Sequence, residues 1–194
     1  MLGHLGDGPV RWDPAGVDDW PAWATEQVHV QAWQSEWPRR GAQLCAELDA
    51  ALASWLVAPV EHVGSTAVPG LAAKPVLDVQ AAVLDLARAG EVAEVLAPSG
   101  WHLVPADLDA RPWRRFLVQV VDGHRAAHLH LLLADGERWH EQLAFRDALR
   151  ADPALVRAYA ELKRSLAAQH GSDREAYTDG KAAFVRSVLT RTGP

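Results

Sequence analysis

Apolar and polar positions recur along most of the chain with two different periods. Four large apolar residues are spaced by four, four and three, which predicts a helix with one buried side: Leu44, Leu48, Leu52 and Trp55. Pro38 suits the first turn of this helix. Alternating or continuous apolar runs bounded by Gly, Pro and Asp predict strands instead. The predicted strands cover residues 28–33, 60–63, 75–83, 101–105, 113–121 and 126–134. Asp122-Gly123 between the last two strands favours a tight hairpin.

Helical periods dominate the rest of the chain. They predict helices over about 86–96 and 137–150, a third that begins at Asp152-Pro153, and a last one that ends near Leu189. Residues 1–27 are rich in Gly, Pro, Asp and Trp and have no clean period, so we expect an irregular N-terminal extension. Residues 28–194 are then expected to form one α+β domain, a small mixed sheet packed by helices.

Strand parity predicts which polar side chains can meet, because alternate residues of a strand share a face. Asp78 and Gln80 point the same way, and the apolar residues between and around them point the other way. His128 and His130 likewise share one face of their strand. An acid, an amide and two imidazoles would therefore gather on one side of the sheet if these strands are neighbours.

The strand before the hairpin adds a guanidinium to this group. By the same parity, Arg115 and Gln119 share the polar face, and Arg114 lies among apolar residues on the other. The collection resembles a binding or catalytic site, and we treat Asp78, His128 and His130 as its candidate catalytic residues.

Each of these residues also has a simpler explanation. A lone acid such as Asp78 near a strand start is usually a solvated surface group, and sheet histidines are often half-exposed without a ligand. The H-x-H spacing of His128 and His130 lets both rings reach one metal, but two ligands do not make a site. Arg115 can cover the sheet with its aliphatic stem. Both interpretations stay open at this point.

The stretch between Glu61 and Asp78 adds a possible anion-binding loop. Gly64 lets the backbone approach a phosphate, successive N–H groups can cradle oxygens, and Ser65 and Thr66 add hydroxyl donors. Lys74 adds a point charge. A plain β-turn is the simpler alternative, since the sequence contains neither a Walker loop nor a dinucleotide fingerprint.

Composition limits the classes of partner. The 194 residues carry a formal charge of −6, which argues against nucleic acid, although the basic run RPWRR at 111–115 suits a small anionic ligand. Cys45 is the one cysteine, so no internal disulfide can form. No apolar run has the length of a membrane span and no secretory signal is evident, so we expect no membrane partner and a cytoplasmic protein.

The stretch EHVGSTAVPGLAAKPVLDV at 61–79 resembles the signature of the GrpB (glutamate-rich protein B) family, a branch of the nucleotidyltransferase-like superfamily. Further segments agree in order: WQSEWPRR at 33–40, RRF at 114–116, HLHL at 128–131, LAFRDALRADP at 143–153, YAELKRSLA at 159–167 and DREAYTDGKAAFV at 173–185. The similarity spans about 28–190. It implies a mixed sheet with the Gly-Ser loop between the first long helix and the acidic strand.

The resemblance also implies roles for the candidate residues. The loop of Gly64, Ser65 and Thr66 would hold a nucleoside triphosphate, with Lys74 and Arg115 neutralising phosphate charge. Active superfamily members hold metal with two acids on the next strand and a third from a later strand.

This chain departs from that pattern of acids. It offers Asp78 first, Gln80 second, and His128 and His130 near the third acid. A metal held by Asp78, His128 and His130 would be Mg²⁺ or Mn²⁺, with Zn²⁺ possible. The histidines can equally serve as general base or bind substrate without metal.

Taken together, the resemblance implies a transferase that binds ATP or another nucleoside triphosphate and passes a nucleotidyl group to, or activates, a small-molecule acceptor. The alternative is a non-catalytic nucleotide- or CoA-binding accessory module, since similar domains occur fused to dephospho-CoA kinase. A third possibility is another metal-dependent enzyme built on the histidine pair. Lys163, Tyr177 and Lys181 are candidate substrate contacts on the C-terminal helices.

Overall fold

The computed structural model describes residues 21–170 and 173–192, so most of the expected N-terminal extension lies outside the described residues. The strands are β1 (Glu61–Val63), β2 (Leu77–Val83), β3 (Trp101–Leu103), β4 (Arg114–Val121) and β5 (His124–Leu133). The helices are α1 (Trp37–Ala51), α2 (Ala89–Leu96), α3 (Ala106–Asp109), α4 (Glu137–Ala151), α5 (Pro153–His170), α6 (Arg174–Asp179) and α7 (Ala182–Thr192).

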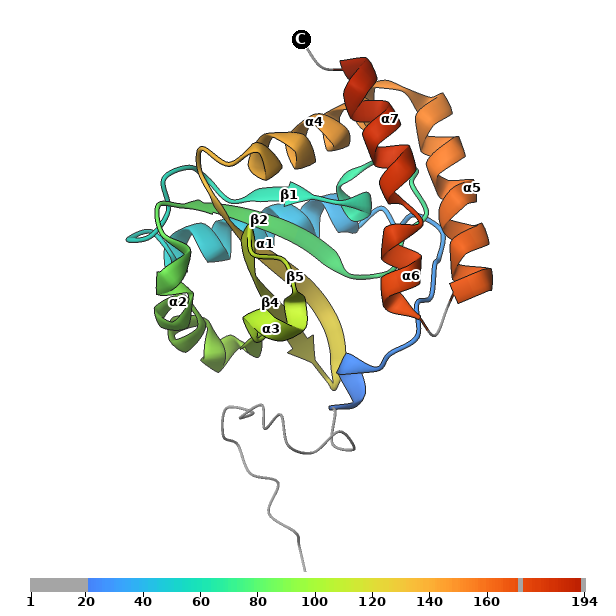
Figure 1. The fold of residues 1–194 in the computed structure, drawn as a ribbon. Coiled ribbons are helices and arrows are strands. Elements are labelled where there is room, and N and C mark those ends of the chain that lie inside the picture. Colours follow the sequence, from blue (N-terminus) through green and yellow to red (C-terminus); the bar gives the residue numbers. More distant parts are fainter. Residues whose placement is uncertain (1–20, 171–172, 193–194) are drawn as a thin grey trace, which may run out of the picture.

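The strands form one mixed sheet in the order β1-β2-β5-β4-β3 (Figure 1). β2 and β5 run parallel at its centre, and the other neighbours are antiparallel. The parallel pair needs a long crossover, which α2, β3 and β4 supply. The expected α+β class with a small mixed sheet is confirmed.

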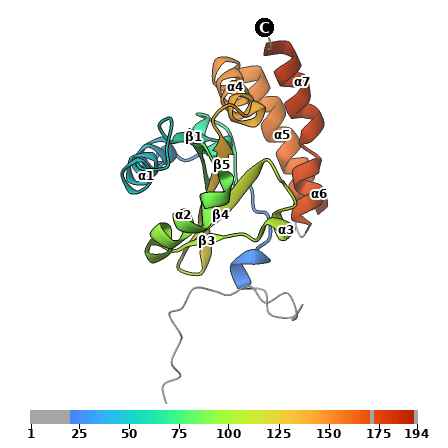
Figure 2. The ribbon, with the colours of Figure 1, turned by 60° about the vertical axis from the view of Figure 1, so that its left-hand side comes forward.

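The two faces of the sheet pack differently. The face with Val79, Leu117 and Leu129 is fully buried against α1 and α2. Figure 2 shows these two helices on one side of the sheet and α4–α7 on the other. On the second side, Trp139 of α4 packs against Ala82, near one end of the central strands. The rest of that face, which carries Asp78 and both strand histidines, is left for a pocket.

The β4–β5 hairpin is confirmed and contains an irregularity that the sequence did not predict. Asp122 and Gly123 both have positive φ, 52° and 77°, as a tight primed turn requires. The register then shifts between Gln119 and Val120, so that Ala126 on β5 has no partner on β4. Because of this β-bulge, residues 114–119 of β4 lie on the opposite face from the one that a regular hairpin would give them.

Two predicted elements were wrong. Residues 28–33 form no strand; they make one bridge, Gln31 to Ala73, and their alternation instead packs Val28 and Val30 against the C-terminal helices. The last helix is split into α6 and α7 at Gly180, where α5 lies so close that a Cβ would meet Leu166 at 2.5 Å.

Candidate functional site

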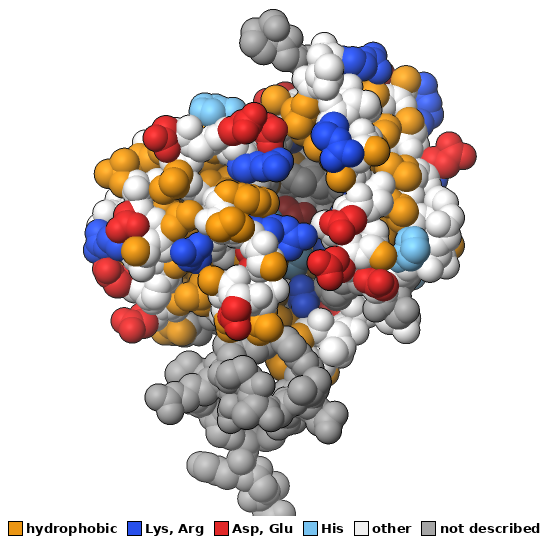
Figure 3. Space-filling view, viewed as in Figure 1, with side chains coloured by type: hydrophobic (Ala, Val, Ile, Leu, Met, Phe, Trp, Pro, Cys, Tyr) orange, Lys and Arg blue, Asp and Glu red, His pale blue; other side chains and the backbone are white. Residues whose placement is uncertain are grey.

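A pocket of about 860 Å³ opens on the sheet face that carries the strand histidines; we call it the central pocket. Its floor comes from β2, β4 and β5, and its walls come from the Gly-Ser loop, α3, α4 and α5–α7. Figure 3 shows the hollow on the face seen in Figure 1, with Lys and Arg side chains around it. A smaller pocket of about 150 Å³ beside α1 holds none of the predicted site residues.

Asp78 lies on the floor of the central pocket, at the start of β2. Its Oδ1 is 2.9 Å from Nδ1 of His128 and 3.8 Å from Nε2 of His130. Burial opposes ionisation of the carboxyl group, but the two rings and the charge of Lys74 outweigh it and hold the pKa of Asp78 well below its ordinary value. Asp78 is therefore a carboxylate at neutral pH.

His128 is a neutral imidazole with a defined tautomer. Burial lowers its pKa to about 3, against the pull of Asp78. Because a carboxylate only accepts hydrogen bonds, Nδ1 of His128 donates to Asp78 and Nε2 keeps its lone pair. That Nε2 is buried and has no hydrogen-bond partner in the described part of the protein. One nitrogen anchored on a carboxylate and the other unprotonated is the geometry of a general base, but a pKa of about 3 makes this ring a weak one, and its Nε2 is enclosed.

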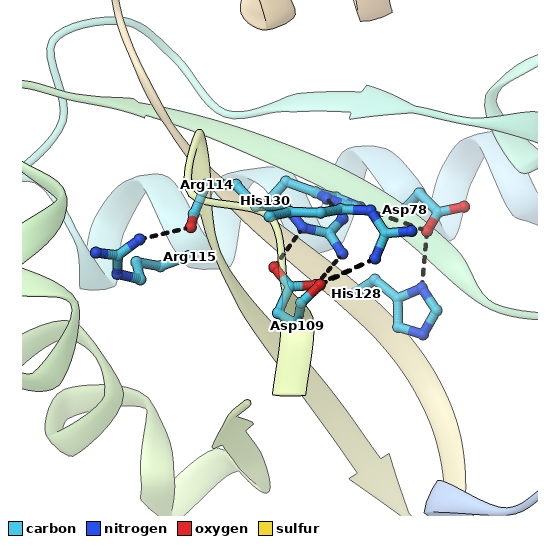
Figure 4. A network of polar contacts seen from close by, with 7 residues as sticks. Asp78, Asp109, Arg114, Arg115, His128 and His130 are labelled. Carbon is cyan, nitrogen blue, oxygen red and sulfur yellow. Dashed lines mark hydrogen bonds and ion pairs between the residues drawn. The ribbon is translucent and has the colours of Figure 1, made fainter. Parts of the chain in front are cut away.

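His130 is fixed by a second network (Figure 4). Arg114 can only donate, and its Nη1 lies 2.7 Å from Nδ1 of His130, so the ring proton sits on Nε2 and faces Asp78. The same guanidinium donates twice to the buried carboxylate of Asp109, at 2.8 and 2.5 Å. Burial, aided by the charge of Arg114, lowers the pKa of His130.

Without a metal, the nitrogens of His128 and His130 that face Asp78 both carry protons. A metal bound there would have to displace those protons. Residues 21–170 and 173–192 contain no cluster of three or more His, Cys, Asp or Glu placed to hold a metal. Metal binding by Asp78, His128 and His130 stays a prediction, and no chemical step is assigned to it.

Gln80, at the position of the second acid, is part of the core. Its side chain is 0% exposed, and Nε2 donates to the backbone oxygen of Trp139 at 3.2 Å. It does not line the central pocket. Its Nε2 thus ties β2 to α4, whereas its buried Oε1 has no hydrogen-bond partner in the described part of the protein.

The Gly-Ser loop lies directly over Asp78, as the sequence led us to expect. Gly64 has φ 67°, and a Cβ at this position would lie 2.6 Å from Oδ2 of Asp78, so only glycine lets the loop pass. Ser65, Thr66 and Lys74 all line the central pocket. Thr66 is buried, and its hydroxyl lies 3.0 Å from Nε2 of His62.

The expected position of Arg115 was wrong. Phe116 pairs with His130 and Arg115 pairs with Leu131, which puts Arg115 on the face away from Asp78. Its guanidinium donates to the backbone oxygen of Arg114 at 2.9 Å and does not line the central pocket (Figure 4). The bulge is the cause, since the unbulged hairpin would have paired Arg115 with His130. Sequence parity had placed Arg114 on the wrong face for the same reason.

Other pocket residues come from elements distant in sequence. Lys163, Tyr177 and Lys181 line the central pocket, as the candidate substrate contacts were expected to. Tyr159 and Asp109 also line the pocket, and neither is among the residues that the sequence singles out as site candidates. The run RPWRR was a usable signal for Trp113 and Arg114, which both line the pocket.

Fold and pocket together define an α+β protein whose candidate ligand site lies on one face of a five-stranded mixed sheet. The chain belongs to the GrpB family, whose model, described as GrpB protein, matches residues 27–191. A UPF0157 protein of Deinococcus radiodurans is 39% identical over 134 residues, which cover 69% of this chain and 67% of that protein. The crystal structure of the conserved protein GrpB from Enterococcus faecalis superposes with a TM-score of 0.73 at 28% identity, covering 84% of this chain and 96% of that one.

A more distant similarity joins the chain to a larger protein. A dephospho-CoA kinase of Mycolicibacterium paratuberculosis is 30% identical over 178 residues, which cover 80% of this chain but only 44% of that kinase. Within the described residues, no helix is long and apolar enough to cross a membrane.

Proposed function

We propose that the chain binds a nucleoside triphosphate in the central pocket and passes its nucleotidyl group to a small-molecule acceptor. The observation that carries the binding step is the charge of the pocket. Eight Lys and Arg side chains line it against four Asp and Glu, although the whole chain has a net charge of −6. Such a local excess of positive charge in a concave site favours an anion.

The lining also suits the rest of a nucleotide. The guanidinium groups of Arg114 and Arg138 each lie 5.3 Å from the ring centroid of Trp113. An aromatic ring near two cations can stack with a base while the arginines contact phosphate. The loop of Gly64, Ser65 and Thr66 lines the pocket beside Asp78, and a glycine-containing turn of this kind can supply backbone N–H groups to a phosphate oxygen.

The transfer step uses the Asp78–His128 pair as general base. The acceptor oxygen or nitrogen forms a bond to the α-phosphorus, and the bond from that phosphorus to the bridging oxygen breaks. The electron pair leaves with pyrophosphate, and the acceptor proton goes to Nε2 of His128. Asp78 then stabilises the imidazolium through its 2.9 Å hydrogen bond to Nδ1. The resemblance implies that a divalent metal would supply further charge stabilisation.

A second candidate is a binding module without turnover. The buried Gln80 at the second acid position and the protonated ring nitrogens that face Asp78 both favour it. In that case the ligand is a nucleotide or a CoA derivative, which the partial similarity to dephospho-CoA kinase also favours.

Binding and pyrophosphate release, measured together, separate the two candidates. Thermal shift and calorimetry against nucleoside triphosphates, CoA derivatives and divalent metals test binding, because a ligand of the native state raises apparent stability. A panel of small acceptors then tests turnover. We expect Asp78→Asn to abolish pyrophosphate release and keep the fold, and the exposed Asp107→Asn to behave like wild type. Binding without release across the panel would favour the module, and no nucleotide binding would reject the proposal.

A further inference from the structure

The lysine side chains of this protein are confined to one part of the molecule. The chain has three lysines among its 19 basic residues, and all the others are arginine. All three lysines, Lys74, Lys163 and Lys181, line the central pocket. Arginine thus serves at every other basic position, including the surface, so the pocket uses an ammonium group where the rest of the chain does not.

Two of the three lysines are built into the same local motif. Tyr159-x-x-x-Lys163 on α5 is repeated as Tyr177-x-x-x-Lys181 at the junction of α6 and α7. In each motif the ammonium lies over the tyrosine ring, 4.8 Å from the centroid for Lys163 and 4.4 Å for Lys181. The rings restrict both ammonium groups to the pocket side, because a cation is attracted to the ring face.

These two charges are not neutralised within the described part of the protein. Lys163 is 2% exposed and donates to the backbone oxygen of Ala72, and no carboxylate forms an ion pair with it or with Lys181 among residues 21–170 and 173–192. Burial lowers the pKa of Lys163 to about 7 and that of Lys181 to about 8. Lys74 and Lys181 lower the pKa of Lys163 further. Desolvated like charges are unfavourable without a compensating group.

An ammonium group binds phosphate with a different geometry from a guanidinium. It is a compact charge with three rotatable donors, so several can converge on one tetrahedral anion. A guanidinium favours planar, bidentate contacts. Three convergent ammonium groups therefore match the terminal phosphates of a polyphosphate.

We infer that Lys74, Lys163 and Lys181 form a subsite for the outer phosphates of the ligand. This inference rests on the proposed function, in which the inner phosphate lies by the Gly64 loop and His128. It adds a division of the pocket: the sheet floor serves the reacting phosphate, and the helical wall holds the leaving pyrophosphate. The ligand class is then a nucleoside triphosphate rather than a monophosphate.

Inorganic tripolyphosphate is the direct probe, since it carries the outer phosphates without a nucleoside. We expect calorimetry to show binding to the wild-type chain. Lys181→Met and Lys163→Met should each weaken it about tenfold to a hundredfold, the effect of losing one charge-assisted hydrogen bond. Arg164→Met is the matched control, because Arg164 is the exposed neighbour of Lys163 on α5 and does not line the pocket. Lys181 is less buried than Lys163, so Lys181→Met still tests the subsite if Lys163→Met fails to fold.

Chemical labelling gives a second readout that needs no variant. An amine-selective acetylating reagent modifies lysine side chains and the N-terminal amine, and tripolyphosphate should slow labelling of Lys181, the more accessible member of the pair, but not of the N-terminus. No binding of tripolyphosphate, equal binding by the lysine variants, or unchanged labelling would overturn the subsite. Nucleotide binding that survives those results would leave the proposed function standing. If nucleotides bind no better than tripolyphosphate, the proposed site for the nucleoside is rejected and the lysine subsite for phosphates stands.

Discussion

The sheet floor and the helical wall of the central pocket treat their charges in opposite ways. On the floor, Asp78, His128, His130 and Arg114 are joined to one another or to Asp109 by short polar contacts. On the wall, the lysines of α5 and the α6–α7 junction lie over tyrosine rings and form no ion pair with a described carboxylate. Among the described residues, the charged groups of the floor are thus paired without a ligand, although Nε2 of His128 has no hydrogen-bond partner, whereas the ammonium groups of the wall have no carboxylate partner. The difference teaches that ligand affinity should come mainly from the wall and that the floor should contribute mainly to stability and chemistry.

The largest expected effect comes from a variant that disrupts the polar network of the sheet floor. Arg114→Met leaves the carboxylate of Asp109 buried without its bidentate partner, so we expect a loss of about 3–5 kcal/mol in unfolding free energy. Arg88→Met removes an equally short but exposed ion pair with Glu91, and should change stability only slightly. Denaturant titration of both variants measures the difference. Equal losses would mean that the floor network carries no special weight.

A smaller effect is expected where the loop crosses the floor. Gly64→Ala introduces a Cβ 2.6 Å from Asp78 in a residue with φ 67°, and should cost about 2–3 kcal/mol. Gly70→Ala is the control, because Gly70 has φ 76° with nothing within 4 Å, and it should cost only about 1 kcal/mol of backbone strain. Thermal unfolding of both variants tests the prediction, and similar midpoints would contradict the close approach.

The pH dependence of the unfolding free energy should separate the contribution of the histidines from that of the wall lysines. Burial lowers the pKa of His62, beside the loop, from 6.5 to about 4, and that of Lys163 from 10.5 to about 7. In both windows the unfolded chain binds more protons, so unfolding free energy should fall as pH falls from about 6.5 to 4 and rise as pH rises from about 7 to 10.5. Each group contributes at most about 1.4 kcal/mol per pH unit.

Two variants assign these windows. His62→Asn should reduce the slope in the acid window, where His128 and His130 titrate as well, and Lys163→Met should reduce the slope in the alkaline window, to which Lys181 also contributes, as read from denaturant midpoints across pH. The charged groups that act on the pKa of Lys163 are Lys181, Asp78, Lys74 and Arg164, so Arg164→Met should change the alkaline slope much less. A slope that Lys163→Met leaves intact would place the titrating group elsewhere.

The smallest effect is expected for Arg115, which the bulge places on the sheet face away from the central pocket. Arg115→Met should change stability by no more than about 0.5 kcal/mol and leave anion binding unchanged, because its guanidinium contacts only backbone oxygens outside the pocket. Calorimetry with tripolyphosphate checks this. Weaker binding by the variant would put Arg115 back into the site.

Much of this fold could be predicted because its signals are local. Helix periods, the Asp122-Gly123 turn and the Asp152-Pro153 helix start all act within a few residues, and the structure confirms each of them. Strand parity also brought Asp78, His128 and His130 together correctly.

The errors came from effects that no short window contains. A single extra residue, Ala126, exchanged the faces of Arg114 and Arg115, and the approach of α5 to Gly180 divided the last helix. The proton positions on the two rings depend on Asp109 and Arg114, which join only in the folded chain. Parity can therefore nominate site residues, but hydrogen-bond partners decide what they can bind.

The bulge has one more consequence, for how this hairpin can change over evolution. A variant whose strands paired without the bulge would turn the β4 residues before it to the opposite face. Arg115 would then lie beside His130, but the fully buried Leu117 would move to the polar face and Arg114 would lose its contact with Asp109. The shifted register is therefore one that the hairpin has to keep.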